Sequence, residues 1–239
     1  MALGTRVVSK VDLIVGPGNE YVTEAKKQLS TRGKVLIDSL AGPTELLIVA
    51  DEATSPAYVT EDLISQAEHG NRTLCGLATS SRETLDSVLK RISSVAFRRR
   101  RAEFIEQSLF YGVLAQSEDL LADFAQQLSP EHVQIMTRNP KRLAKKISAK
   151  EGLTMIGDYA PCAATDYMVG TNHILPTGGE AAFHSGLSVS LFLKRCTAVE
   201  GNRNSLRRSS RYISSLAELE GFSNHAAAPL SRFEEGQVL

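Results

Sequence analysis

The sequence lacks the features that mark several specialised classes of protein. The 239-residue chain carries 27 basic and 27 acidic residues, which gives a formal net charge of zero. Because a balanced chain has no broad field to attract nucleic acid or anionic lipid, we expect neither as a partner. No apolar run reaches the length that spans a bilayer, and the N-terminus lacks the long apolar core of a signal peptide.

Cysteine is scarce as well. The three cysteines are Cys75, Cys162 and Cys196, and no two of them have C-x-x-C spacing. This odd, widely spaced set argues against a disulfide framework and against a thiolate zinc site, and it favours reduced thiols in a cytoplasmic protein. The one basic run, at 98–101, is predicted to be a solvated helix end, with an anion contact as the alternative.

Apolar runs alternate with helical patterns over most of the chain, and this rhythm is typical of an α/β fold with a largely parallel sheet. After residue 157 the sequence becomes rich in Gly, Pro, Thr and Asn, and such a long irregular segment is more often functional than idle. From about residue 187 the chain is predicted to be helical again. Strands are predicted at 11–15, 35–37, 46–50, 74–78, 111–115, 133–136 and 153–156, and helices at 21–30, 57–69, 82–107 (one or two helices), 117–128, 140–149 and 206–220.

The most informative stretch, residues 37–69, joins a tight Ala-Gly-Pro-Thr-Glu turn, a buried strand and a helix that ends in Gln66-Ala67-Glu68-His69. On a helix, Gln66 and His69 would share one face and could hold one ion or one small molecule. A zinc site needs imidazole nitrogens and carboxylate or amide oxygens. Gln66, His69, Asp166 and His225 would supply two of each, although spacing alone leaves open whether these four meet.

Two further segments are candidates for chemistry. Glu131 and His132 follow Pro130, and a carboxylate beside an imidazole is a good acid–base pair. The alternative, a helix-to-strand corner with exposed polar side chains, stays open. The sequence Gly16-Pro17-Gly18-Asn19 follows a strand and opens a helix, so its amides could face a phosphate or Asn19 could cap the helix. It is not the G-x-G-x-x-G fingerprint of dinucleotide-binding loops.

Seven segments together resemble the histidinol dehydrogenase family, in family order and over nearly the whole chain. They are VDLIVGPGNEYVTEAK (11–26), IDSLAGPTELLIVAD (37–51), EDLISQAEH (61–69), SPEH (129–132), ATDYMVGTNHILPTGG (164–179), SGLSVSLFLKR (185–195) and LAELEGFSNHA (216–226). The resemblance implies an NAD-linked, zinc-dependent oxidation of L-histidinol to L-histidine through the aldehyde.

The resemblance also implies roles for individual residues. It gives the acid–base work, including activation of water for the second oxidation, to Glu131 and His132, and a cofactor contact to Asn19. The implied zinc ligands are Gln66, His69, Asp166 and His225. The implied substrate contacts are Thr44, Gln66, His69, His132, Asp166, His173, Glu220 and His225.

The family further implies an intertwined homodimer whose C-terminal tail, with Glu220 and His225, reaches into the partner's active site. We therefore expect an α/β fold with Rossmann-like parallel-sheet layers and a small C-terminal helical appendage. The expected domains are 1–36, the remnant of a first α/β domain and crossover; 37–186, an α/β domain with the zinc and acid–base residues; and 187–239, a helical dimerisation tail. We expect the chain to lack the N-terminal region of the family.

Two alternatives stay open. A paralogue could oxidise another small polar alcohol, such as a sulfonated propanediol, and the substrate contacts would then differ in chemistry. A chain without a complete cofactor domain could instead be an inactive metal-binding or dimerisation remnant. The presence of both Glu131 and His132 argues against the second alternative.

Overall fold

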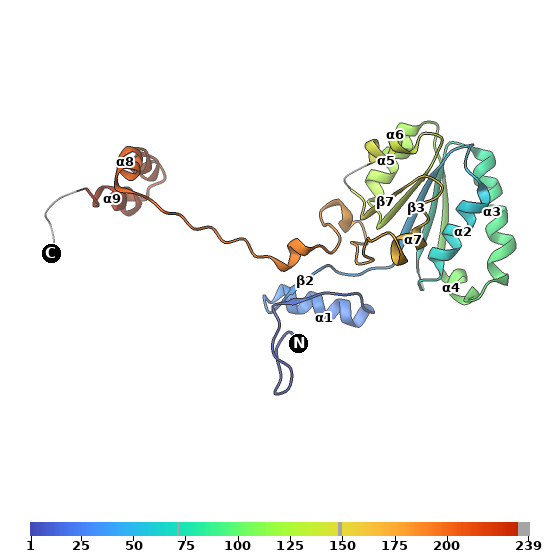
Figure 1. Cartoon of the computed structure of the whole chain (residues 1–239), viewed down its shortest axis with the longest axis horizontal. Coiled ribbons are helices and arrows are strands. Elements are labelled where there is room, and N and C mark those ends of the chain that lie inside the picture. Colours follow the sequence, from blue (N-terminus) through green and yellow to red (C-terminus); the bar gives the residue numbers. More distant parts are fainter. Residues whose placement is uncertain (71, 148–149, 234–239) are drawn as a thin grey trace. The chain divides into compact units, whose positions relative to one another are not determined.

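The computed structural model describes residues 1–70, 72–147 and 150–233 (Figure 1). The chain divides into two compact units, Met1–Leu193 and Lys194–Leu239, which we call the α/β unit and the C-terminal unit. The division into domains at residues 36 and 186 stays a prediction.

The α/β unit is built on a five-stranded sheet in which every neighbouring pair is parallel. The strand order is β5-β4-β3-β6-β7, so the central strand is β3. All six residues of β3 are buried, as expected for a parallel strand that is covered on both faces. The predicted parallel α/β fold is confirmed. The strands are β3 (Glu45–Ala50), β4 (Leu74–Thr79), β5 (Leu109–Leu114), β6 (His132–Met136) and β7 (Leu153–Ile156).

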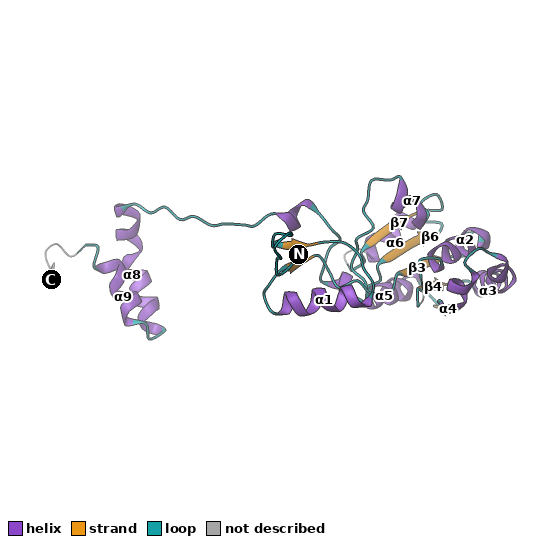
Figure 2. Cartoon of the chain, turned by 90° about the horizontal axis from the view of Figure 1, so that it is seen from below, coloured by secondary structure: helices purple, strands orange, loops and turns teal. Residues whose placement is uncertain are grey.

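Helices cover both faces of this sheet (Figures 1 and 2). Because alternate residues of a strand point to opposite faces, Leu46 and Ile48 of β3 lie in one hydrophobic cluster and Leu47 and Val49 in another. The first cluster includes α2 (Pro56–Ala67), α3 (Arg82–Val95), α4 (Ala102–Gln107) and α7 (Cys162–Tyr167). The second includes α5 (Glu118–Leu128) and α6 (Pro140–Ile147).

A smaller layer precedes the sheet. Strands β1 (Leu13–Ile14) and β2 (Leu36–Ile37) pair in parallel, and α1 (Glu20–Thr31) connects them. The backbone N–H of Val22 donates to the Asn19 side chain at 3.1 Å, so the predicted helix cap is confirmed.

A buried ion pair fastens this layer. Lys26 Nζ lies 2.7 Å from Asp38 Oδ1 and donates to the Gly16 carbonyl at 2.5 Å, while the Gly16 N–H donates to Asp38 Oδ2 at 2.7 Å. Burial alone raises the pKa of Asp38, but the hydrogen bonds from Lys26 and from the Gly16 and Ser39 amides outweigh it, and the pKa is lowered. The ion pair therefore fixes the turn at Gly16 against the segment that leads into β3.

The C-terminal unit is a pair of helices, α8 (Arg203–Leu219) and α9 (Ser223–Leu230). Ala217 and Ala226 are buried, and the Ser214 hydroxyl of α8 donates to the Ala226 carbonyl at 2.7 Å. Helix α8 begins three residues before the predicted start because Asn202 caps it, accepting from the Ser205 N–H at 2.9 Å.

Several element boundaries differ from the predictions. Helix α2 ends at Ala67, so His69 lies in the turn after the helix and not on it. The stretch 82–107, predicted to be one or two helices, is two helices, separated by a 3₁₀ turn (Ala96–Arg98) and by Arg101 in the left-handed region at φ 60°. Helix α7 lies inside the segment predicted to be irregular. Residues 148–149 of the predicted helix 140–149 lie outside the described residues. Among the described residues, the helices are too short or too polar to cross a membrane.

Candidate active site

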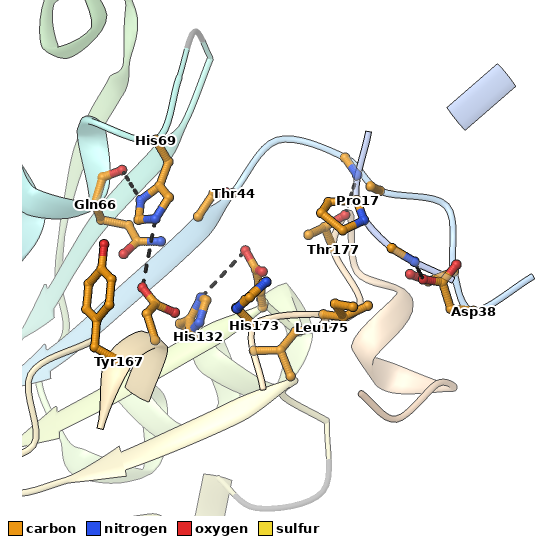
Figure 3. Close-up of a pocket in the computed structure, with 17 residues that line it drawn as sticks. Pro17, Asp38, Thr44, Gln66, His69, His132, Tyr167, His173, Leu175 and Thr177 are labelled. Carbon is orange, nitrogen blue, oxygen red and sulfur yellow. Dashed lines mark hydrogen bonds and ion pairs between the residues drawn. The ribbon is translucent and has the colours of Figure 1, made fainter. Parts of the chain in front are cut away.

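A cavity of about 380 Å³ in the α/β unit brings most of the predicted site residues together (Figure 3). It lies beside the amino ends of β3 and β6, since Thr44 directly precedes β3 and His132 begins β6. Helix α2 follows β3 in the chain, and Gln66 near its C-terminal end and His69 in the turn after it line the same cavity. The predicted site residues that line the cavity are Thr44, Gln66, His69, Glu131, His132, Asp166 and His173.

This position differs from the usual one in doubly wound sheets, where ligands bind at the carboxyl ends of the strands beside the point at which the strand order reverses. Here Asp51 lies at the carboxyl end of β3. Its carboxylate accepts from the Ala53 N–H at 2.9 Å and from the Arg138 N–H at 2.7 Å. Those two amides therefore bind a side chain of the protein itself. The sheet has the parallel arrangement of a Rossmann-like fold, but the cavity lies at the amino ends of its strands.

One wall of the cavity carries Gln66, His69 and Asp166. The Gln66 side chain is buried at the end of α2. The His69 Nδ1 lies 3.1 Å from the backbone carbonyl oxygen of Gln66, so we place the ring proton on Nδ1, which leaves Nε2 without a proton. That Nε2 lies 3.8 Å from Asp166 Oδ2 of α7 (Figure 3).

Another wall carries the buried pair Glu131 and His132. The His132 Nδ1 lies 3.3 Å from the Glu45 carbonyl oxygen and 3.5 Å from Glu131 Oε2. Because both neighbours are acceptors, we place the proton of the neutral ring on Nδ1. Within the described residues, the buried Nε2 has no hydrogen-bond partner. Burial by itself lowers the pKa of His132, but the neighbouring Cys162 and Glu131 side chains outweigh burial, and the pKa is raised.

The backbone around this pair is closely determined. Ser129 adopts a left-handed conformation (φ 47°) at the end of α5, and Pro130 then leads into Glu131. On the other side, the Leu153 N–H donates to the Glu131 carbonyl at 2.8 Å. A Cβ on the neighbouring Gly152 would lie 2.6 Å from that carbonyl oxygen, so the close approach requires glycine.

The comparisons with known proteins give the family of the chain. The family model described as histidinol dehydrogenase matches residues 1–233. The chain belongs to the histidinol dehydrogenase family. A histidinol dehydrogenase of Methanococcus maripaludis is 40% identical over 229 residues, which are 95% of this chain and 53% of that protein. One of Methanocaldococcus jannaschii is 39% identical over 98% of this chain and 54% of its own length.

A solved structure gives the same result. The crystal structure of histidinol dehydrogenase from Elizabethkingia anophelis matches with a TM-score of 0.91 and 34% identity, over 98% of this chain and 54% of that one. The chain therefore spans about half the length of the histidinol dehydrogenases that it matches.

Three predicted residues do not line the cavity. Asn19 is absent from its wall, although its neighbours Gly16 and Pro17 contribute to it. Glu220 and His225 belong to the C-terminal unit, where both are exposed and the His225 ring lies 5.3 Å from that of Phe222. In the described part of the chain, no three His, Cys, Asp or Glu side chains gather as a metal site. The predicted set differs from such a group because it includes an amide and a residue of the other unit.

The structure adds cavity residues that sequence reasoning missed: Asp38, Tyr167, Leu175 and Thr177. Thr177 Oγ1 accepts from the Gly42 N–H at 2.6 Å, which ties the loop that carries His173 to the turn that carries Thr44. Glu45 was missed as well, although a charged residue at the head of a wholly apolar strand was a visible signal.

Proposed function

We propose that this chain carries the zinc-binding and acid–base residues of a histidinol dehydrogenase that oxidises L-histidinol to L-histidine in two NAD-linked steps. The observation that carries the proposal is the pair of walls in one cavity: Gln66, His69 and Asp166 on one, Glu131 and His132 on the other. Family membership supports the reaction, and the geometry supports the division of roles.

The residues of the first wall fit zinc. The separation of 3.8 Å between His69 Nε2 and Asp166 Oδ2 is too long for a hydrogen bond, and it is near the ~3.4 Å between two ligands of one tetrahedral zinc. The backbone carbonyl of Gln66 accepts from Nδ1 of His69, and such a second hydrogen bond is expected of a metal-binding imidazole. His225 would be the fourth ligand. When bound, zinc supplies a Lewis acid that holds the amino alcohol, and NAD accepts hydride.

The second wall moves protons. With its Nδ1 held by the Glu45 carbonyl and Glu131, the neutral form of His132 can accept the proton of a substrate hydroxyl at Nε2 as hydride leaves the carbon. Because the pKa of His132 is raised to about 10, we expect the neutral form, and with it the rate, to increase as the pH rises toward that value. In the second oxidation a water molecule adds to the aldehyde, and Glu131 takes its proton. Thr44 and His173, from the two loops joined through Thr177, are proposed to contact the substrate.

The remaining proposals concern the partner copy, the cofactor and the location. Glu220 and His225 are proposed to act in the site of a second copy within a homodimer, and Asn19 to contact NAD. The three free cysteines support a cytoplasmic location.

The test is oxidation of L-histidinol, measured as NADH and L-histidine formation. The chain is assayed alone and together with the part of the Methanococcus maripaludis relative that the match does not cover. We expect turnover that stops on chelation and returns with zinc. Zinc binding without NAD reduction in either assay would refute the proposal, and faster turnover of dihydroxypropanesulfonate would identify a different substrate.

Mixing two variants tests the exchange of tails. A His69→Ala chain and a His225→Ala chain are each expected to bind zinc weakly. If His225 acts in the partner's site, a mixture that is unfolded and refolded together regains part of the tight zinc binding. The absence of any recovery would show that each site uses its own tail.

A further inference from the structure

We propose that Glu45 is a positioning residue that holds the Glu131–His132 pair and the 173–179 loop in register around the cavity. This inference rests on the proposed function, since it concerns the acid–base residues named there. Glu45 is the first residue of β3, directly after Thr44, and it is 9% exposed.

Both oxygens of the Glu45 carboxylate bind backbone amides. Oε2 accepts from the Glu131 N–H at 3.2 Å, and Oε1 accepts from the Gly178 N–H at 3.0 Å. These donors are distant in sequence, 86 and 133 residues away. A single side chain thus joins the amino end of β6 to the loop that carries His173.

The contact with the acid–base pair is reciprocal. The Glu45 N–H donates to Glu131 Oε2 at 3.2 Å, and the Glu45 carbonyl oxygen lies 3.3 Å from His132 Nδ1. Glu45 therefore contacts the backbone of Glu131, the carboxylate of Glu131 and the ring of His132. In the β3–β6 ladder Leu46 pairs with His132, so the sheet register itself supports this arrangement.

A carboxylate at this place is costly for the fold. Burial raises the pKa of Glu45, and the negative charge of Glu131 acts in the same direction, while the two backbone amides and His132 oppose them. Burial and the Glu45 charge also raise the pKa of Tyr111. A position filled only for stability would be better served by an apolar residue of similar volume.

Two acceptor oxygens are needed here because two N–H groups point at the side chain. Glutamine offers one oxygen and turns an NH₂ group toward the second N–H, while aspartate is one methylene shorter. Glu45→Gln is therefore expected to release either Glu131 or Gly178 without changing the volume of the core.

The test reads His132 directly in the intact, zinc-loaded chain. Nitrogen-15 NMR of the imidazoles follows the tautomer of His132 in wild type, Glu45→Gln, Glu45→Asp and the control Glu106→Gln, which is an exposed residue of α4. The spectra are recorded at alkaline pH, where the ring is neutral, because the pKa of His132 is raised. We expect a single Nδ1–H tautomer in wild type and the control, and a mixture of tautomers in Glu45→Gln. The zinc affinity should stay unchanged because Gln66, His69 and Asp166 do not contact Glu45.

Kinetics of the active mixture supply a second readout. For Glu45→Gln we expect kcat to fall about 10- to 100-fold with little change in KM, because the base is misplaced while substrate binding persists. An unchanged tautomer and unchanged kcat would overturn the inference. Loss of cooperative folding in both Glu45→Gln and Glu45→Asp would also overturn it, since a structural role would then suffice. The NMR readout needs no substrate, so it can fail while histidinol oxidation holds.

Discussion

In the α/β unit, Glu131 and His132 are buried and hydrogen-bonded on several sides, whereas in the C-terminal unit Glu220 and His225 are exposed. The first pair sits where β3, β6 and the Gly152 turn converge, and its geometry is set when the sheet folds. Glu220 is the C-cap residue of the 17-residue helix α8 and His225 lies on the 8-residue helix α9, and these two helices bury few side chains. This difference is what we expect if the α/β unit builds the site and the C-terminal unit supplies Glu220 and His225 to the site of a second copy, as proposed.

The largest effect on folding is expected at the buried ion pair of the α/β unit. Replacing Lys26 with methionine leaves the Asp38 carboxylate buried without its cation, and we expect a loss of about 3 kcal/mol in the free energy of unfolding. Chemical denaturation measures this loss. The neighbouring exposed Lys27→Met is the matched control and should change stability by less than about 0.5 kcal/mol. Equal effects of the two substitutions would contradict the assignment.

The same ion pair predicts a pH dependence. Because the pKa of Asp38 is lowered below its ordinary value of 3.8, the charged form stabilises the folded state. This contribution is complete above about pH 4 and is lost as the pH falls through the folded value. Denaturation curves across acid pH should show this loss in wild type and a flatter profile in Asp38→Asn. An unchanged profile would place the acid-sensitive group elsewhere.

A smaller effect on the free energy of unfolding is expected from replacing one glycine with alanine in each unit. Gly152→Ala places a Cβ 2.6 Å from the Glu131 carbonyl oxygen and should cost about 1–3 kcal/mol, with a loss of activity as Glu131 shifts. In Gly201→Ala, near the start of the C-terminal unit, the Cβ would meet no atom within 4 Å. Thermal unfolding of both variants checks the contrast, and equal shifts would show that the Glu131 backbone tolerates displacement.

The smallest effect on folding is expected at Leu219, an 85% exposed apolar residue of α8. Leu219→Gln should change the free energy of unfolding of the isolated chain by less than about 0.5 kcal/mol. If the C-terminal unit meets a second copy, the substitution should still weaken dimerisation measured by sedimentation. A large loss of stability at low protein concentration would show that Leu219 belongs to a core within the chain.

The sequence predicted the sheet well because the central strands are buried on both faces and appear as continuous apolar runs. It failed where tertiary contacts decide. Helix α7 has the short sequence CAATDY, which shows no clear hydrophobic periodicity. Packing against α2 and β7 stabilises it, and this packing could not be predicted from the local sequence. The sequence pattern predicts that helix α2 continues to His69, whereas it ends at Ala67, shortly before Gly70, which has a φ of +155°.

The site residues were predicted through the family resemblance more than through spacing. The Gln66–His69 interval predicts a shared helix face, yet the structure holds His69 through a hydrogen bond to the backbone carbonyl of Gln66 after the helix ends. The partners of Glu45 and Thr177 could not be predicted, because they lie 86 to 135 residues away and contact these side chains only in the folded chain.

The most direct test of the central claim is the zinc stoichiometry and affinity of the intact chain, measured by equilibrium dialysis. We predict one tightly bound zinc per chain, with an affinity that falls at least about 100-fold in His69→Ala and in His225→Ala. It should stay unchanged in His184→Ala, an exposed histidine outside the proposed set. Equal zinc binding by wild type and His69→Ala would contradict the account, because the wall of the cavity formed by Gln66, His69 and Asp166 would then not be the metal site.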